Sequence, residues 1–194
     1  LVQRLFVQGL PLISRPLLKL DPVWFSIQRF FLKMLLAGYD VFFTFEYGIN
    51  VDITEKKYLY IVHAIESAAI LGAKNIVVHS VTTPKGVDFE QYNIEFYKSF
   101  IPYCEKAGIC VAVENLFGRY TKRNRLTSKL GTPKELNSIV EKINSPWIVA
   151  CVDIGHAALT GYEPEKFIEG VNPGILKSLH VQDNDYLGDK HILP

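Results

Sequence analysis

The fold of this chain is decided by the stretch WIVACVDIGHAAL, residues 147–159, in which a continuous apolar run ends at an acid. A strand with one face in water alternates apolar and polar residues, whereas this run is apolar throughout. The pattern therefore predicts a strand that is buried on both faces, as in a parallel sheet covered by helices. Asp153, Gly155 and His156 follow at once, so the polar groups stand where the strand ends.

Short runs of β-branched and aromatic residues recur along the chain, and each predicts a strand. The further strands are expected at residues 41–45, 75–79, 110–114 and 176–181. Helical patterns lie between them, at residues 54–71, 88–107, 132–144 and 163–170. Strands that alternate with helices indicate a parallel α/β sheet, either a barrel or a doubly wound open sheet. No glycine-rich phosphate loop follows a strand, which disfavours the nucleotide-binding open sheet.

The chain divides into an N-terminal segment of unassigned structure, residues 1–40, and a series of βα units over residues 41–194. Within the first segment, a helix is predicted at about residues 21–38, because an acid precedes Pro22 and a glycine follows the apolar residues. Polar and charged residues interrupt this helix, and its length falls short of the roughly 20 apolar residues that a membrane span needs. A helix packed on the sheet is therefore favoured.

Composition and charge describe a folded domain without a strong electrostatic preference. Of the 194 residues, 48% are hydrophobic and 21% charged, and the formal net charge is +1. Nucleic acid and anionic membranes are therefore not expected as main partners. The three cysteines form no CxxC pair and are odd in number, which disfavours a disulfide framework and a zinc knuckle. A reducing, cytoplasmic location is expected.

Acids and histidines occupy equivalent places in successive units. His79 ends one strand, Glu114 the next and Asp153 the next, and His180 lies near the end of the last. A parallel barrel gathers the carboxyl ends of its strands around one rim, so these four side chains are expected to face one another. Carboxylates that converge in a partly dry pocket need a positive charge between them. Each residue alone has a plainer reading as a packing or capping residue, but together they predict a divalent metal site.

The mixed set of imidazole and carboxylate ligands suits Mn, Zn, Co or Mg, and the residue types do not choose among these metals. His156 follows the strand by one turn, where it would contact the substrate, bind the metal or cap a helix; the sequence leaves these roles open. The turn-rich loop after His180 places Asp189 and His191 on the same expected face.

A basic loop at residues 118–129 follows Glu114 and contains Arg119 among five cationic residues and no acid. Such a loop would hold a sugar phosphate or another anion beside the metal. A solvated cationic loop is the commoner explanation, and both readings stay open.

The stretches VVHS, VAVENL, CVDIGHAALTG and LHVQDNDYLGDKHILP resemble the xylose-isomerase-like TIM-barrel superfamily. That superfamily includes sugar and sugar-phosphate isomerases and epimerases, and also apurinic endonuclease IV. The resemblance covers about residues 40–194 and implies a parallel (β/α)8 TIM barrel. It also implies that Glu114, Asp153 and His180 are metal ligands and that His156 contacts the substrate. A further glutamate ligand is missing, and a full barrel has about 250 residues, so the barrel is expected to be incomplete at its C-terminus.

The resemblance implies a divalent-metal-dependent sugar or sugar-phosphate isomerase or epimerase with no other cofactor. The cation would polarise a carbonyl while a carboxylate removes the neighbouring carbon-bound proton, giving a metal-stabilised enediolate. Glu114 is the expected base as well as a ligand, and His156 the second catalytic residue. A hydride shift is the other known route. The sugar, its phosphorylation and the formation of a homo-oligomer stay open.

Two other functions are compatible with the sequence. One is an endonuclease IV-like zinc phosphodiesterase acting at abasic DNA, in which His79, Asp189 and His191 would be additional metal ligands. Against it, the strand end before His79 offers Glu46 and Tyr47 instead of a histidine, and the chain lacks the basic charge of a DNA-binding surface. The other is a degenerate, non-catalytic barrel that binds sugar.

Overall fold

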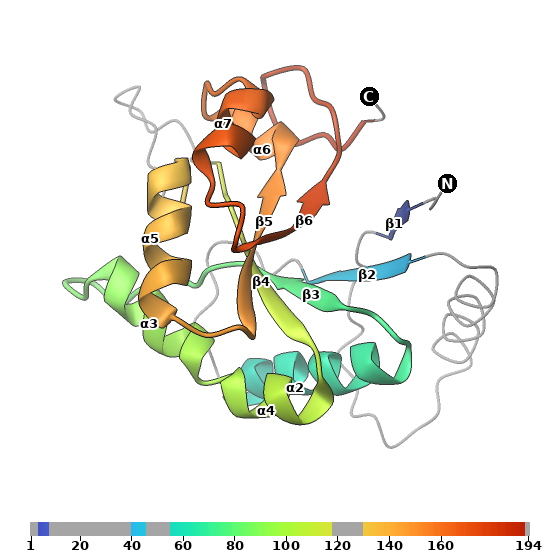
Figure 1. Cartoon of the computed structure of the whole chain (residues 1–194). Coiled ribbons are helices and arrows are strands. Elements are labelled where there is room, and N and C mark those ends of the chain that lie inside the picture. Colours follow the sequence, from blue (N-terminus) through green and yellow to red (C-terminus); the bar gives the residue numbers. More distant parts are fainter. Residues whose placement is uncertain (1–3, 8–39, 46–54, 118–129, 193–194) are drawn as a thin grey trace.

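A computed structural model describes residues 4–7, 40–45, 55–117 and 130–192 of the chain (Figure 1). Its strands form one six-stranded sheet in the order β1-β2-β3-β4-β5-β6, and all neighbours are parallel. The strands are β1 Arg4–Val7, β2 Asp40–Phe45, β3 Asn75–Val78, β4 Cys110–Glu114, β5 Ile148–Asp153 and β6 Leu176–His180.

Strands that follow one another in the chain are also neighbours in the sheet, as in a (β/α)8 barrel. A doubly wound open sheet would reverse its strand order at one point, and no reversal occurs among the described strands. The predicted barrel-type α/β fold and the five predicted strands are therefore confirmed. β1 falls within residues 1–40, so this segment contributes a strand that the sequence did not predict. The boundary at residue 41 stays a prediction, and the helix expected at about residues 21–38 lies outside the described residues.

The helices are α2 Glu55–Ile70, α3 Phe89–Lys98, α4 Ile101–Ala107, α5 Pro133–Ile143, α6 Ile154–Leu159 and α7 Pro164–Gly170. Figure 1 shows α2 to α5 ranged along one side of the curved sheet. In the described part of the chain, no helix is long and apolar enough to cross a membrane.

Alternate residues of the central strands belong to two different cores. Val111 and Val113 of β4 pack with the helices in the larger core, which also contains Leu136 of α5. Ala112, between them, points the other way and packs with Val149 of β5 in a smaller cluster inside the curved sheet. Because both faces of each strand are buried, the strands are apolar along their whole length, as the sequence pattern indicated.

The single helix predicted over residues 88–107 is wrong, because the structure contains two helices there. α3 ends at Lys98, and α4 starts at Ile101 with Pro102 in its first turn. Proline has no N–H to donate and its ring crowds the preceding turn, so it suits the start of a helix and not the interior. Phe100, at the junction, is fully buried.

A capping box is present at the start of α5. The backbone N–H of Glu135 donates to Thr132 Oγ1 at 3.2 Å, and the backbone N–H of Thr132 donates to Glu135 Oε2 at 3.0 Å. Two N–H groups that would lack partners at the helix start are thereby satisfied. The box fixes the first turn of α5, which packs over β4 and β5.

Replacing the capping hydroxyl should weaken the fold measurably. Thr132→Ala is expected to lower the free energy of unfolding by about 1 kcal/mol, because one N–H of α5 loses its acceptor. Urea denaturation checks the value. Lys134→Ala, at an exposed position in the same turn, is the control and should change stability by less than about 0.5 kcal/mol. Equal losses in the two variants would contradict the capping role.

Candidate metal centre

The Glu114 carboxylate lies at the centre of the site, at the carboxyl end of β4. Its side chain is 1% exposed. His79 Nε2 lies 2.7 Å from Glu114 Oε2, and His180 Nδ1 contacts Glu114 Oε1. Burial acts to raise the pKa of Glu114, but the two imidazoles outweigh burial and hold that pKa well below its usual range. The buried carboxylate is therefore ionised and depends on positive charge around it.

Asp153 ends β5 and begins α6, and its side chain is completely buried. One oxygen, Oδ1, accepts the backbone N–H of His156 at 2.8 Å and caps the helix. The other, Oδ2, lies 3.6 Å from His180 Nδ1. The two readings of Asp153, as a cap and as a ligand, are therefore compatible, because Oδ1 caps the helix and Oδ2 faces His180.

Strand register explains why these side chains meet. β5 and β6 pair Asp153 directly with His180, so the two residues lie at the same height. β3 and β4 pair Val78 with Val113, so the next residues, His79 and Glu114, are also level. Parallel strands bring their carboxyl ends to the same edge of the sheet. The structure thus brings together the four strand-end residues that the sequence singled out.

A second cluster adjoins the first and is formed by His156, Asp189 and His191. His156 Nε2 lies 3.3 Å from Asp189 Oδ2, and His191 Nε2 lies 2.9 Å from the same oxygen. Burial acts to lower the pKa of His156, but the contact with Asp189 and the nearby acids raise that pKa to about 9. Burial likewise acts to raise the pKa of Asp189, and the contacts with His156 and Gln182 lower it to about 2. The pair is therefore charged at neutral pH.

The sequence did not predict Gln182, which joins the two clusters. Its Nε2 lies 3.0 and 2.9 Å from the two oxygens of Asp153 and 2.9 Å from Asp189 Oδ1. A Cβ atom on Gly155 would lie 2.7 Å from Gln182 Cδ, so glycine at that position leaves room for the amide. The available signal was the position of Gln182, two residues after His180 and therefore on the same side of the extended chain.

Asn115 is a second residue whose role the sequence did not predict. Its Oδ1 accepts the backbone N–H of Asp153 at 2.6 Å, and its Nδ2 donates to the backbone carbonyl of Asp153 at 3.0 Å. His156 Nδ1 lies 2.9 Å from the Asn115 backbone carbonyl. Asn115, the residue that follows Glu114, is therefore hydrogen-bonded to the end of β5. Its only sequence signal is that it follows Glu114 directly.

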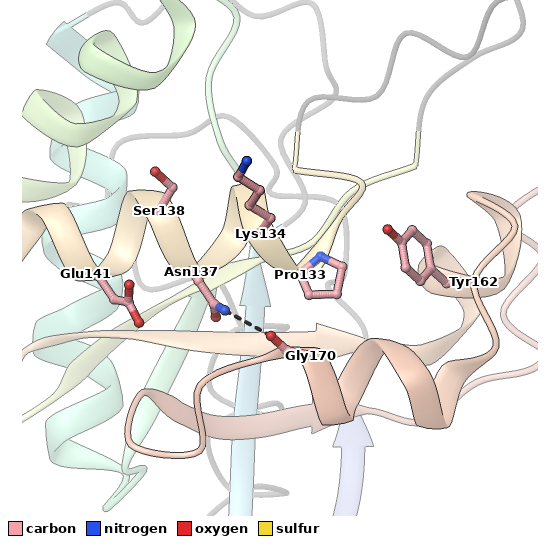
Figure 2. Close-up of a pocket in the computed structure, with 7 residues that line it drawn as sticks. All are labelled: Pro133, Lys134, Asn137, Ser138, Glu141, Tyr162 and Gly170. Carbon is pink, nitrogen blue, oxygen red and sulfur yellow. Dashed lines mark hydrogen bonds between the residues drawn. The ribbon is translucent and has the colours of Figure 1, made fainter.

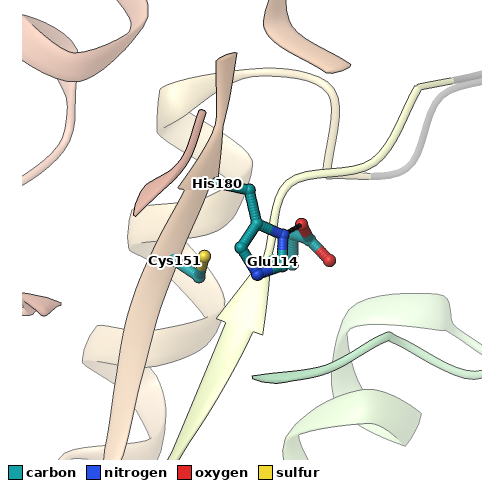
Figure 3. A group of neighbouring side chains, drawn as sticks. All are labelled: Glu114, Cys151 and His180. Atoms are coloured by element: carbon teal, nitrogen blue, oxygen red, sulfur yellow. Dashed lines mark ion pairs between the residues drawn. The ribbon is translucent and has the colours of Figure 1, made fainter. Parts of the chain in front are cut away.

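Three groups of side chains have ligand atoms within 4.8 Å of one another: Glu114, Asp153 and His156; Glu114, Cys151 and His180 (Figure 3); and His156, Asp189 and His191. Both Glu114 oxygens are buried and, in the part of the chain that the structure describes, neither makes a hydrogen bond of proper geometry. A divalent cation would satisfy these oxygens, and the donors around them are those that Zn and similar metals accept. The residues present therefore fit a cation. Arg119, the proposed anion ligand, lies outside the described residues.

A shallow surface hollow beside α5 is separate from this site (Figure 2). Asn137 Nδ2 donates there to the Gly170 backbone carbonyl at 2.9 Å. Its lining residues are Pro133, Lys134, Asn137, Ser138, Glu141, Tyr162 and Gly170. Glu141 is the one acid in this set and no histidine or cysteine accompanies it, so the hollow lacks the ligands of the strand-end site.

The family described as xylose isomerase-like TIM barrel matches residues 30–192. None of the curated proteins is significantly similar to this chain in sequence.

Solved structures with the same fold include an epimerase-like protein, an epimerase and a protein with bound zinc. A D-tagatose 3-epimerase-like protein has a TM-score of 0.68 and 21% identity, over 97% of this chain and 70% of that chain. The 3-keto-D-glucoside 4-epimerase of E. coli has a TM-score of 0.65 and 17% identity, over 82% of this chain and 65% of that chain. The IOLI protein, solved with a bound zinc atom, has a TM-score of 0.62 and 12% identity, over 89% of this chain and 64% of that chain. At these identities the likeness shows the fold.

Removing the Gln182 amide should weaken cation binding. In Gln182→Met the Asp153 carboxylate loses the donor that orients it, and the dissociation constant for Zn²⁺ is expected to rise by about 10- to 100-fold. Calorimetric titration of the metal-free chain measures this constant. Asp185→Asn, at an exposed position in the same loop where the side chain pairs with Lys190, is the control and should bind like the parent chain. An unchanged constant in Gln182→Met would show that Asp153 does not need the amide.

Proposed function

The chain belongs to the xylose isomerase-like TIM barrel family, and on that premise we propose that it is a divalent-metal-dependent sugar isomerase or epimerase. Glu114, Asp153 and His180 are the proposed ligands of one cation. The observation that carries the proposal is the ionised Glu114 carboxylate, which is 1% exposed. Among the described residues, its two oxygens contact the rings of His79 and His180 but make no hydrogen bond of proper geometry. Burying such a charge is costly unless a cation offsets it.

The proposed chemistry is the movement of a proton next to a carbonyl. When bound, a divalent cation polarises the carbonyl and offsets the negative charge of the developing enediolate. Glu114 is the proposed base that removes the carbon-bound proton, since an ionised carboxylate can accept it. His156, held between the Asn115 carbonyl and Asp189, is proposed to orient a substrate hydroxyl.

A ketose is the substrate class that the similar structures favour. They include a D-psicose 3-epimerase crystallised in the presence of D-fructose and an L-ribulose 3-epimerase. The chain spans between 54% and 70% of the length of the structures it matches. Sugar specificity and activity of the whole protein are therefore part of the proposal.

A second candidate function is cleavage of DNA at abasic sites by several metal ions. The His156, Asp189 and His191 cluster favours it, because these three ligand atoms lie within 4.8 Å of one another and would hold a further cation. The near-neutral net charge of +1 opposes it, since DNA binding relies on basic surface. His79 is a proposed additional metal ligand in this function, because its Nε2 lies 2.7 Å from Glu114 Oε2.

Glu114→Gln should abolish exchange between a ketose and solvent. With D-fructose in deuterated water, the rate of deuterium incorporation at the carbon next to the carbonyl is expected to fall by about 100-fold or more, because the amide cannot accept the proton. NMR measures the exchange, and circular dichroism verifies that the variant is folded. Glu165→Gln, at an exposed position on α7, is the control and should exchange like the parent. Exchange that persists in Glu114→Gln would rule out this base.

The number of bound ions separates the two candidate functions. Elemental analysis of the purified chain should find about one divalent ion per chain for the isomerase, and about three for the nuclease. A chain without any ion, which also takes up none on dialysis against Zn²⁺ or Mn²⁺, would instead support a non-catalytic sugar-binding barrel.

A further inference from the structure

We propose that Cys151 is a thiolate ligand of the cation held by Glu114 and His180, and that the site therefore takes a thiophilic divalent metal such as zinc or cobalt. This ligand rests on the proposed function only in requiring that a cation binds between Glu114 and His180. The sequence patterns passed over this ligand, since the three cysteines offered no metal-binding spacing.

Strand register places Cys151 beside Glu114. β4 and β5 pair Glu114 with Cys151, so the two residues are level on neighbouring strands. Cys151 shares the inner cluster with Ala112, which lies two residues before Glu114 on the same side of β4. Asp153 stands two residues further along β5, on the same side as Cys151. The thiol therefore lies directly below the rim on which the proposed ligands meet.

The side-chain atoms are close enough to share an ion. Cys151 Sγ lies within 4.8 Å of ligand atoms of both Glu114 and His180, and Figure 3 shows the three side chains gathered together. Independently of the thiol, both oxygens of Glu114 are buried and, among the residues that the structure describes, neither makes a hydrogen bond of proper geometry. A cation at this place would contact the carboxylate, the imidazole and the sulfur at once. The outcome is a mixed O, N and S donor set, which zinc accepts readily.

The position of Cys151 also has a packing explanation, as filler of the inner cluster. Its companions there, Val77, Ala112 and Val149, carry no donor atom. Cys151 thus stands at the one point of that cluster where a side chain is level with an ionised acid. Cys104 packs in the outer core, whereas Cys110 packs against the inner cluster from the start of β4, four residues before Glu114.

Coordination by Cys151 has a definite chemical balance. The S–H bond breaks, a sulfur–metal bond forms and the proton passes to solvent, with no change in oxidation state. Thiolate ligands favour zinc and cobalt, whereas magnesium and manganese prefer oxygen donors. The proposal therefore narrows the metals left open by the sequence to the first pair.

Cobalt(II) is the probe that tests this directly, because a cobalt–thiolate bond produces a charge-transfer band in the near ultraviolet. Titration of the metal-free chain with Co²⁺ should produce that band together with the weaker visible bands of bound cobalt. Cys151→Ser should lose the ultraviolet band and retain the visible ones. Cys110→Ser, the matched control on β4, should retain both sets.

Several outcomes of the cobalt titration would contradict the proposed thiolate ligand. Visible bands without a charge-transfer band in the parent chain would overturn the thiolate ligand and leave the proposed cation site standing. A charge-transfer band that survives Cys151→Ser, or that Cys110→Ser removes, would also overturn it. Failure of the parent chain to bind Co²⁺ would overturn both this inference and the metal-dependent function.

X-ray absorption on the unmodified chain loaded with one equivalent of Zn²⁺ gives a test that needs no variant, should Cys151→Ser fail to fold. A sulfur shell at about 2.3 Å, beside the oxygen and nitrogen shell at about 2.0–2.2 Å, is expected. Absence of the longer shell would contradict the proposal.

Discussion

The structure of the site depends on one constraint, the burial of an ionised carboxylate at the end of β4. Moving a carboxylate out of water costs several kcal/mol even after the protein relaxes, so the surroundings of Glu114 must supply positive charge. His79, which directly follows β3, and His180, the last residue of β6, contact its two oxygens. Asp153 adds a second buried acid beside His180. A cation held between these acids and imidazoles would supply further positive charge.

A network of hydrogen bonds behind the rim holds these proposed ligands in place. Asn115 forms two hydrogen bonds with the backbone of Asp153, and Gln182 donates to the Asp153 carboxylate. The loop that follows β6 is closed by paired hydrogen bonds between Asp183 and Ile192. That closure returns Asp189 and His191 to His156, so the second cluster is assembled by a loop and the first by strands. Positions set by a sheet are more rigid than positions set by a loop.

The sequence could predict the strand-end residues because strands that are consecutive in the chain are neighbours in this parallel sheet. His79, Glu114 and Asp153 each end an apolar run, and equivalent ends of parallel strands share one edge. Gln182 could not be predicted in the same way, because the partners of an amide depend on which distant carboxylates it meets. Cys151 sits within an apolar run, and its link to Glu114 follows from the register of β4 against β5, which no local pattern reveals. Pro102 did carry a signal for the break between α3 and α4, since proline starts helices more readily than it continues them.

The most direct test of the account is anomalous diffraction from crystals of the chain soaked in Zn²⁺. The account predicts one strong peak within about 2.0–2.2 Å of oxygens of Glu114 and Asp153 and of a nitrogen of His180. A peak that contacts none of these three side chains, or no peak at the carboxyl ends of β4, β5 and β6, would contradict the claim that the strand ends share a cation.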